Sequence, residues 1–466
     1  MRGKAYSIKP KVVKEINTPY RRIITKIPVP ASIHILEELH RHEPHATTGQ
    51  PPIVWDRAKG FQVWDAYGNM WLDWSSGVLV TNVGHGHPKI VDAIIQQARR
   101  QLLHNYCFPS ELRAKLARKL VALAPPGLDK VFLLTTGSET TECAIKLALT
   151  YGRSIGGDKK NGIISYEGAF HGRTLGAQLI GGIPALKEWI GSCMPDFHQL
   201  PFPGDFRNPN NKFKDSLALL EKKGIQNRQL AAVIMETYQG GNAAFAPIEY
   251  VGELSRWCKK NRILLIFDEV QAGFGRTGKM FGFEHYKVLP DLICLGKAIS
   301  SSLPLSAVLG RTEIMDQYGP GEMTSTHMGN PICVAAALAN LEILEKEKIL
   351  ENVHVVGKVL KKGLKRIQIK YSDFIAAAPC QGLVAGLHIV HVGTLKPFDD
   401  LAFNIVGRAF EKGLLMFAPV GRAVVKVSPP LCISEEALLD GIETLDEAIS
   451  EAISEHQKKC SPTRRN

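Results

Sequence analysis

Residues 263–281 read ILLIFDEVQAGFGRTGKMF, and residues 292–310 read LICLGKAISSSLPLSAVLG. Each stretch opens with a short apolar run and then changes to small and polar residues, which is typical of a buried strand that ends in a loop. Asp268 and Glu269 follow the first run, and Lys297 follows the second. Charged groups at buried strand ends are costly unless they have a partner. The two stretches therefore predict buried strands with polar chemistry at their ends.

The same pattern extends on both sides of these strands, from about residue 110 to residue 310. Apolar runs alternate with helical stretches, with strands expected at 131–136, 162–166, 230–236, 263–270, 292–296 and 305–310, and helices at 139–152 and 249–261. Short apolar strands separated by helices indicate a mostly parallel sheet covered on both faces. The predicted fold class is α/β.

The two chain ends predict a second, smaller region. Residues 60–77 alternate apolar and polar side chains around Tyr67-Gly68-Asn69, which predicts a hairpin, and an amphipathic helix is expected over 90–102. A helical region from about 330 to 371 precedes two further expected strands at 382–390 and 423–431. We expect the following division: a basic arm (1–30), the N-terminal part of a small domain (31–85), a large domain (86–335), the C-terminal part of the small domain (336–456) and a basic tail (457–466).

Charge and cysteine usage argue against several classes of protein. The chain has 466 residues and a net charge of +12, but residues 1–30 hold eight Lys or Arg against one Glu, and residues 457–466 hold four without an acid. The body of the chain is therefore nearly neutral, which favours solvated basic ends over a nucleic-acid surface. The nine cysteines include no CxxC pair, so we expect no metal site and a reducing compartment, the cytoplasm. No apolar run is long enough to span a bilayer, and we expect no membrane association.

The segment LLTTGSETTECAIKLA, residues 133–148, places a strand directly before a helix. The N-terminus of a helix has unpaired N–H groups and partial positive charge, which suit a phosphate. Gly137 would let the backbone approach the phosphate, and Ser138 would add a hydroxyl. The alternative is that Ser138 is an ordinary helix cap.

The segment ISYEGAFHGRT, residues 164–174, follows another expected strand. Ligands bind at the carboxyl ends of parallel strands. There Phe170 could stack on a flat ring, and Arg173 could grip a carboxylate through two hydrogen bonds. The alternative is that Phe170 packs in the core and Arg173 lies on the surface.

Lys297 and Asp268 complete the set of candidate catalytic groups. A lysine in an apolar stretch has a lowered pKa, which makes its neutral amine available as a nucleophile, although a lone lysine often reaches out to solvent instead. A protonated pyridine nitrogen is the kind of cation that would compensate a carboxylate at position 268. Otherwise Asp268 could simply cap a helix.

Together these segments resemble the class III aminotransferases of the 4-aminobutyrate and ornithine type. Residues 267–300 resemble the signature of that family, in which Lys297 lies 29 residues after Asp268. TTGSETTECAIKLA resembles its TGSEAxExAIKLA, GAFHGRT resembles GAYHGRT, and STHMGNPICVAAALANLEIL resembles GTxxGNPxxxAAALAxLxxL. The resemblance covers roughly residues 50–450.

The resemblance implies pyridoxal 5′-phosphate (PLP) as cofactor and fold type I, with a seven-stranded large domain and a small domain built from both chain ends. It implies that an amino group moves from an ω-amine or amino acid to a keto acid by a ping-pong route. The implied catalytic residues are Lys297, which would hold PLP as a Schiff base and shuttle a proton, and Asp268, which would pair with the pyridinium nitrogen.

The other implied contacts follow from the same segments. Gly137 and Ser138 would hold the phosphate, Phe170 would stack on the ring, and Gln271 would reach the 3-oxygen of the ring. His171 and Glu236 would lie beside the cofactor, Thr326 would touch the phosphate of the neighbouring subunit in a homodimer, and the implied substrate contacts are Val78, Arg173 and Lys426.

Two positions depart from the family pattern. Many members that act on ω-amines pair a glutamate in EPVQGEGG with a late arginine, but this chain has Gly241 and Lys426 at those positions. Lysine lacks the planar fork of arginine, so the usual grip on 2-oxoglutarate is in doubt, unless Arg422 or Arg173 serves instead. PLP phospho-lyases and racemases of the same family are the alternatives, and a non-catalytic binding protein is the alternative from another class.

Overall fold

The computed structural model describes residues 4–191, 196–208, 211–419 and 423–460. The chain forms two compact units. One comprises residues 88–350, and the other comprises residues 1–87 together with 351–466.

A seven-stranded sheet forms the centre of the larger unit, in the order β6-β12-β11-β10-β9-β7-β8. The strands are β6 (Lys130–Leu134), β7 (Gly162–Tyr166), β8 (Phe197–Leu200), β9 (Leu230–Glu236), β10 (Leu264–Asp268), β11 (Leu292–Leu295) and β12 (Ser306–Gly310). Only β12 runs antiparallel to its neighbours. Every residue of β7 and of β9 to β12 is buried, because the sheet is covered on both faces. The predicted mostly parallel α/β sheet is confirmed, and β8 was not predicted.

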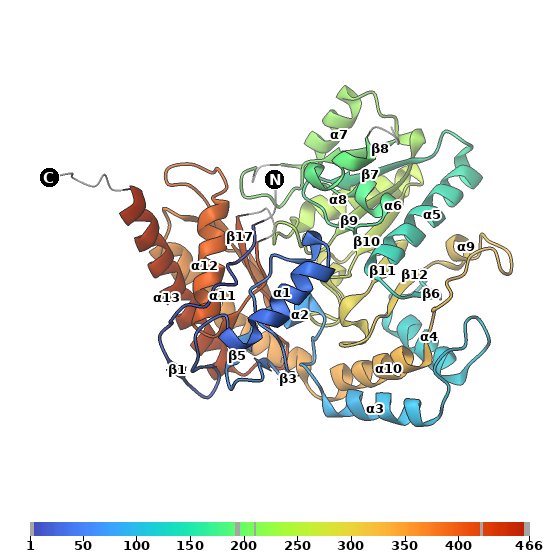
Figure 1. The fold of residues 1–466 in the computed structure, drawn as a ribbon. Helices are drawn as coiled ribbons and strands as arrows, with labels where there is room; N and C mark the ends of the chain where they lie inside the picture. Colours follow the sequence, from blue (N-terminus) through green and yellow to red (C-terminus); the bar gives the residue numbers. More distant parts are fainter. Residues whose placement is uncertain (1–3, 192–195, 209–210, 420–422, 461–466) are drawn as a thin grey trace. The chain divides into compact units, whose positions relative to one another are not determined.

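Helices cover both faces of this sheet. The chain crosses the sheet in one direction through α5 (Gly137–Gly156) and in the opposite direction through α8 (Ile248–Asn261). The connection from β6 to β7 contains α5, and the connection from β9 back to β10 contains α8. Right-handed crossovers that run in opposite directions place these helices on opposite faces, and Figure 1 shows α5 and α8 on either side of the strands. Next to them lie α6 (Leu175–Ile180), which contacts α5, and α7 (Phe213–Lys222), which contacts α8.

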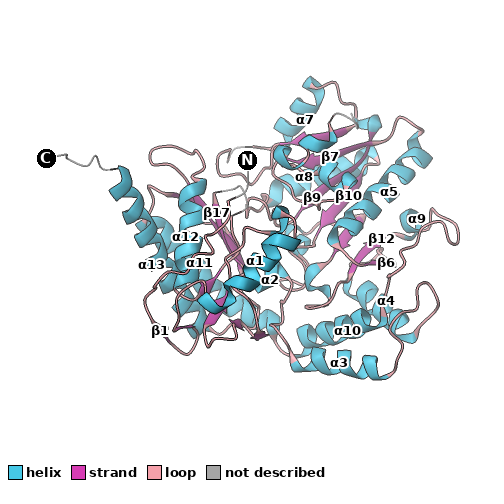
Figure 2. Cartoon of the chain, in the orientation of Figure 1, coloured by secondary structure: helices cyan, strands magenta, loops and turns pink. Residues whose placement is uncertain are grey.

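The remaining helices of this unit are α3 (Pro88–Arg99), α4 (Glu111–Leu123), α9 (Thr312–Met315) and α10 (Pro331–Lys346). The apolar helix α10 packs against both α3 and α4, and Figure 2 shows the three together below the strands of the unit. Within the described part of the chain, no helix combines the length and apolarity needed to cross a membrane.

The smaller unit contains two sheets. The first has the order β1-β2-β5-β4-β3, with β16 beside β5, and the second has the order β13-β15-β14, with β17 beside β15. Their strands are β1 (Ile16–Asn17), β2 (Arg22–Ile23), β3 (Arg57–Lys59), β4 (Gln62–Trp64), β5 (Met70–Asp73), β13 (Ile375–Ala377), β14 (Cys380–Gln381), β15 (Val384–Ile389), β16 (Leu414–Leu415) and β17 (Val424–Val427). The helices of this part of the chain are α1 (Ile33–His42), α2 (Ser76–Leu79), α11 (Ile349–Lys370), α12 (Asp399–Glu411) and α13 (Glu435–Cys460). The β4–β5 hairpin confirms the turn predicted at Tyr67-Gly68-Asn69.

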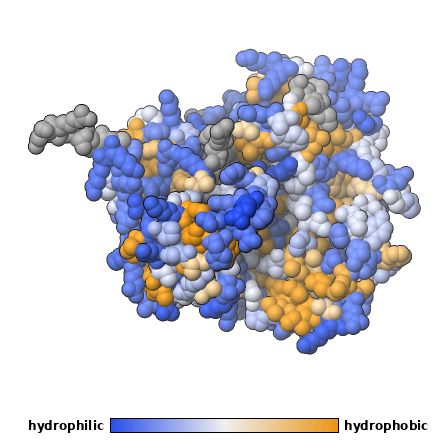
Figure 3. Space-filling view, in the orientation of Figure 1, coloured by the Kyte–Doolittle hydropathy of each residue, from blue (hydrophilic) through white to orange (hydrophobic). Residues whose placement is uncertain are grey.

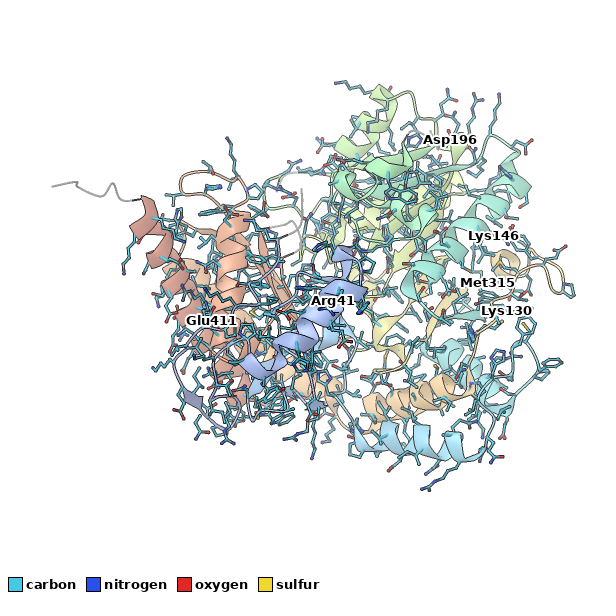
Figure 4. The ribbon with its side chains drawn as sticks, viewed as in Figure 1. Arg41, Lys130, Lys146, Asp196, Met315 and Glu411 are labelled. Atoms are coloured by element: carbon cyan, nitrogen blue, oxygen red, sulfur yellow. The ribbon has the colours of Figure 1, made fainter. Side chains whose placement is uncertain are left out.

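The basic N-terminal arm is not a solvated extension, so that expectation was wrong. β1 and β2 join the first sheet. Lys11 pairs with Glu411 of α12, which is labelled in Figure 4, and Arg21 makes two hydrogen bonds to Asp440 of α13. The prediction weighed the charge of the arm alone, whereas its acidic partners come from helices about 400 residues further along the chain. Residues 461–466 of the predicted tail lie outside the described residues.

Candidate active site

The candidate site lies where the strands of the larger unit end. Gly137 follows β6, Phe170 follows β7, Glu236 ends β9, Asp268 ends β10 and Lys297 follows β11. These strands are mutually parallel, so their carboxyl ends meet along one edge of the sheet, where open α/β sheets bind ligands. A pocket at this edge contains about 430 Å³ of empty space, part of it open to solvent, and is lined by Thr136, Gly137, Ser138, Phe170, His171, Gly172, Asp268, Val270, Gln271 and Lys297.

One wall of the pocket is the N-terminus of α5. Its cap is Thr136, not Ser138: the Thr136 hydroxyl accepts a hydrogen bond from the N–H of Glu139, and the Glu139 carboxylate accepts one from the N–H of Thr136. This reciprocal capping box leaves the N–H groups of Gly137 and Ser138 without an acceptor among the described residues. A 20-residue helix therefore presents two free donors and its positive dipole end to the pocket.

Gly137 is required by close packing. A Cβ atom at this position would lie 2.9 Å from Cγ1 of Val270, too close for any real side chain. Since Val270 also lines the pocket, it holds the first turn of α5 against the loop after β10. The sequence prediction missed Val270, and its place two residues after Asp268 was the only available signal.

Asp268 and His171 form a buried pair beside the pocket. Nδ1 of His171 lies 2.8 Å from one carboxylate oxygen of Asp268, and the N–H of Val270 donates to the other at 3.0 Å. Burial alone would lower the pKa of His171, but the hydrogen bond to Asp268 and the nearby charge of Glu236 raise it on balance. The Nε2 atom of His171 is buried without a partner among the described residues. An imidazole with its proton on Nδ1 would donate this hydrogen bond to the Asp268 carboxylate.

Glu236 lies behind Phe170. It accepts hydrogen bonds from the N–H of Phe170 and the N–H of Gly240, each at 3.0 Å, and the side chain of Gln271 lies 3.4 Å from the same carboxylate. Burial raises the pKa of Glu236 to about 7; His171 opposes this shift and Asp268 adds to it. The acid thus fixes the backbone of Phe170 and the side chain of Gln271 at the rim of the pocket.

Lys297 faces this acidic group of residues. Its backbone has a positive φ of 45°, a strained conformation for a residue with a side chain. Burial lowers the pKa of Lys297, although Asp268 and Glu236 pull it the other way. Among the described residues its ammonium group has no hydrogen-bond or ion-pair partner, so a primary amine with a depressed pKa is available in the pocket.

The two adjacent acids at the end of β10, Asp268 and Glu269, have different roles. Whereas Asp268 lines the pocket, Glu269 accepts hydrogen bonds from the Thr237 hydroxyl and from the N–H groups of Gly282 and Phe283, at 2.7–2.8 Å. Burial raises the pKa of Glu269 to about 7, against the effect of these three donors. Glu269 therefore fastens the following loop and does not line the pocket.

Several of the predicted substrate contacts, and one predicted cofactor contact, lie outside this cluster. Arg173 is at its rim, with its guanidinium 5.7 Å from the centre of the Phe170 ring, but it does not line the pocket. Thr326 is exposed in the turns before α10 and does not line the pocket either. Val78 and Lys426 belong to the smaller unit. Arg422 lies outside the described residues.

The pocket fits a flat, phosphorylated, basic ring. Free N–H donors at Gly137 and Ser138 suit the phosphate, Phe170 and Val270 suit the two faces of a ring, and Asp268 suits a protonated ring nitrogen. The free amine of Lys297 suits an aldehyde carbon. Such a donor set on a mostly parallel sheet defines a PLP enzyme of fold type I.

Comparison with known proteins identifies the family. The sequence pattern of the family described as aminotransferase class-III matches residues 45–449. The chain is 34% identical to the acetylornithine aminotransferase of Caldanaerobacter subterraneus subsp. tengcongensis, covering 87% of this chain and 96% of that protein. It is 31% identical to the 4-aminobutyrate aminotransferase of Mycobacterium leprae, covering 92% and 98%.

A solved structure extends the likeness to three dimensions. The (S)-enantioselective omega-transaminase from Thermomicrobium roseum superposes with a TM-score of 0.81 at 29% identity, covering 91% of this chain and 98% of that one. The chain belongs to the class III aminotransferase family. It is a PLP-dependent aminotransferase, as the sequence predicted.

Proposed function

We propose that this enzyme moves an amino group from an ω-amine or amino acid to a keto acid in two half-reactions. The observation that carries this proposal is the pocket in which the free amine of Lys297, the carboxylate of Asp268 and the N-terminus of α5 converge. Bound PLP would supply an electron sink for the negative charge that develops on the substrate carbon.

In this proposal the protein would hold the cofactor by its phosphate, its ring face, its 3-oxygen and its ring nitrogen. The N–H groups of Gly137 and Ser138, with the Ser138 hydroxyl, bind the phosphate. Phe170 would stack on the ring, and Gln271 would donate to the oxygen at ring position 3. Asp268 keeps the ring nitrogen protonated, and His171 supports it by holding the carboxylate from its other side at 2.8 Å.

Lys297 carries out the proton transfer. Its amine would hold the cofactor covalently before substrate arrives, and once released it would serve as the base and acid that moves the proton of the substrate Cα. A lowered pKa suits this task because the amine has to be neutral to accept the proton.

Substrate binding involves Val78, Arg173 and Lys426 in this proposal. Arg173 is supported by its position beside Phe170. Lys426 lies on β17 with its ammonium 5.2 Å from the centre of the Phe417 ring. A lysine at 426 and a glycine at 241 favour substrates that do not need a bidentate arginine grip.

We also propose a homodimer in which Thr326 reaches the phosphate of the partner's cofactor. Large apolar side chains support such an interface: Val91 and Ile95 on α3, and Leu102, Leu103 and Phe108 just after it, are all more than 40% exposed. Figure 3 shows a hydrophobic surface over the part of the larger unit that contains α3 and α10. Cytoplasmic location remains part of the proposal, on the argument that the nine cysteines of the sequence are scattered and include no CxxC pair.

The test is a panel of half-reactions with purified, PLP-loaded protein. Donors are 4-aminobutyrate, 5-aminovalerate, ornithine and acetylornithine, and acceptors are pyruvate and 2-oxoglutarate. We expect at least one donor to change the visible absorbance of the cofactor and one acceptor to restore it. Phosphate release from O-phosphoethanolamine, or racemisation of an amino acid, without amino transfer would instead identify a lyase or a racemase.

A further inference from the structure

The loop that joins β7 to α6 contains three residues of the pocket wall, Phe170, His171 and Gly172. Among the described residues, the backbone of 170–173 makes no hydrogen bond to another backbone group. This loop is therefore not placed by secondary structure, as a strand or a helix would be. Because buried backbone groups need partners, side chains from other elements have to hold the loop, and they determine where the pocket residues lie.

Two of these side chains come from the start of α5. The Thr141 hydroxyl, which is fully buried, donates to the carbonyl of His171 at 2.8 Å and lies 3.2 Å from the carbonyl of Gly137. The Ser138 hydroxyl accepts a hydrogen bond from the N–H of Arg173 at 3.2 Å. Thr141 thus ties the turn that would hold the phosphate to the loop that carries His171.

Glu142, the next residue of α5, holds the far end of the loop. Its carboxylate accepts hydrogen bonds from the Thr174 hydroxyl at 2.5 Å and from the N–H of Ala177 at 3.1 Å. Thr174 is the N-cap residue of α6, but its own side chain caps none of the N–H groups of that helix. A Cβ atom at Gly176 would lie 2.3 Å from the Glu142 carboxylate. The acid on α5 therefore caps α6 from outside, and the two helices lie side by side in Figure 1.

The middle of the loop lies directly against α5. Gly172 has a φ of 134°, and a Cβ atom there would lie 2.4 Å from the hydroxyl oxygen of Ser138. Only glycine lets two backbones approach this closely. Glycine adds no side chain that could anchor the loop, so the hydrogen bonds on either side of Gly172 have to fix its position.

The position of the loop matters because the imidazole of His171 has one anchor. Its Nδ1 atom lies 2.8 Å from Asp268, whereas Nε2 is buried without a partner among the described residues. The ring is thus placed by one side-chain hydrogen bond and by its own backbone. A backbone shift of about 1 Å away from Asp268 would stretch that bond beyond hydrogen-bond range.

We infer that Thr141 and Glu142 are positioning residues that hold the loop 170–174 against α5 and thereby keep His171 on Asp268. This inference rests on the proposed function, in which Asp268 binds the ring nitrogen of the cofactor. Neither Thr141 nor Glu142 is among the described residues that line the pocket, so neither needs to touch cofactor or substrate. Their effect reaches the cofactor through the loop, the imidazole and the Asp268 carboxylate.

The first experiment uses a matched pair of threonines. Thr140 and Thr141 are adjacent on α5 and both fully buried, but among the described residues the Thr140 hydroxyl binds only the Gly137 carbonyl of its own helix, at 2.6 Å. Thr141→Val should weaken PLP binding about tenfold, because the carbonyl of His171 loses its donor. Thr140→Val should weaken it less than about twofold, and Thr141→Ser, which keeps the hydroxyl, should restore most of the affinity. Equal losses in Thr140→Val and Thr141→Val would overturn the inference.

The second experiment tests the route through His171. His171→Ala keeps the backbone carbonyl that Thr141 binds but removes the imidazole. If Thr141 acts through that imidazole, the effect of Thr141→Val on PLP affinity should shrink from about tenfold to less than about twofold in the His171→Ala background. An undiminished loss in the double variant would overturn the inference, because Thr141 would then act on another part of the site.

The third experiment needs neither PLP nor activity. In the full chain without added PLP, the backbone amides of 170–177 should exchange with deuterium about tenfold faster in Thr141→Val and in Glu142→Ala than in the wild type. Thr140→Val, and Glu142→Gln with its remaining acceptor oxygen, should exchange as the wild type does. Unchanged exchange in Thr141→Val and Glu142→Ala, or faster exchange with full PLP affinity, would overturn the inference. The expected changes in a protein that transfers no amino group would contradict the proposed function and leave the inference standing.

Discussion

At the scale of single residues, the end of β10 gives its two adjacent acids different roles: Asp268 belongs to the pocket, and Glu269 holds neighbouring loops. Successive side chains on a strand point to opposite faces. Asp268 consequently lines the pocket and Glu269 receives three donors from neighbouring loops. A substitution of Asp268 should therefore affect the pocket, and a substitution of Glu269 should affect the fold of the following loop, although both acids are buried at the same strand end.

The first prediction concerns Lys297. Lys297→Ala should still bind PLP through the phosphate contacts, but borohydride should no longer fix the cofactor to the protein, and amino transfer should fall by several orders of magnitude because the proton shuttle is lost. The control is Lys160→Met. Lys160 is also buried and also has a pKa lowered by burial, but it donates to the carbonyl of Leu230 at the opposite ends of the strands. Near-normal turnover by Lys297→Ala would refute the proposed function.

The second prediction concerns Asp268. Asp268→Asn keeps the shape of the side chain but removes the charge that holds the ring nitrogen protonated, so PLP affinity should fall about ten- to hundred-fold. Loss of deuterium from the substrate α-carbon should slow more than covalent PLP attachment. Asp291→Asn is the control, because Asp291 is a partly buried acid that binds the N–H of Leu265 at the other end of β10. Equal slowing of deuterium loss in the two variants would contradict the pairing role.

The sequence predicts a site residue only where a motif of neighbouring residues indicates its role, and not where the role depends on a tertiary contact. Lys297, Asp268 and Gly137 lie in segments with a fixed spacing, so their place at the strand ends follows once the sheet is recognised. Val270 could not be predicted from its place two residues after Asp268 alone, because its role depends on the close contact with Gly137, which follows a different strand.

At the scale of elements, the predicted strands and helices of the larger unit were confirmed because continuous apolar runs, typical of strands buried on both faces, alternate with helical stretches. β8 was missed, since its sequence FHQL is short and half polar. The basic arm was misjudged for a different reason. Its order depends on Glu411 and Asp440, whose pairing with it is a property of the tertiary fold.

The third prediction concerns α11, where like charges at i, i+4 spacing repel one another and destabilise the helix. Lys358, Lys362 and Arg366 are exposed at i, i+4 spacing and have no acidic partner among the described residues. Lys362→Glu replaces two repulsive pairs with attractive ones, so the free energy of unfolding should rise by about 0.5–1 kcal/mol. Urea unfolding at low and high salt measures the gain, which should shrink at high salt as the charges are screened.

The matched control for this charge reversal is Lys346→Glu on α10. Lys346 pairs with Glu342 at i, i+4 spacing, so the same reversal there should lower stability, again less at high salt. A stability gain in both variants would mean that helix propensity, and not charge pairing, sets the effect.

At the scale of the whole molecule, the fourth prediction concerns assembly. If Thr326 binds the phosphate of the partner's cofactor, Thr326→Ala should weaken PLP binding about tenfold in a two-fold dimer. Mixing Lys297→Ala with Thr326→Ala subunits should then restore activity at limiting PLP. Each mixed dimer has one site with both wild-type residues and one site with neither.

The mixing experiment also identifies the opposite arrangement. If Thr326 served the site of its own chain, no mixed dimer would contain an intact site, and mixing would add nothing to the activity of the Thr326→Ala protein. Sedimentation equilibrium supplies the independent readout, and a fully active monomer would contradict the dimer.

The last prediction concerns the acceptor and rests on Lys426. Lys426 is the one half-buried residue of the otherwise buried strand β17, and its ammonium lies 5.2 Å from the centre of the Phe417 ring. A lysine there offers no planar fork for a carboxylate. Pyruvate should therefore be a better acceptor than 2-oxoglutarate. Lys426→Ala should lower kcat/KM for anionic substrates about ten- to hundred-fold, the effect of about 1.5–3 kcal/mol from one charge-assisted hydrogen bond, and affect neutral amines less. Lys426→Arg should raise the efficiency with 2-oxoglutarate because it restores the bidentate geometry. Half-reaction kinetics with both keto acids on the three proteins decide the matter. A strong preference for 2-oxoglutarate that survives in Lys426→Ala would mean that another residue, with Arg173 the first candidate, grips the second carboxylate.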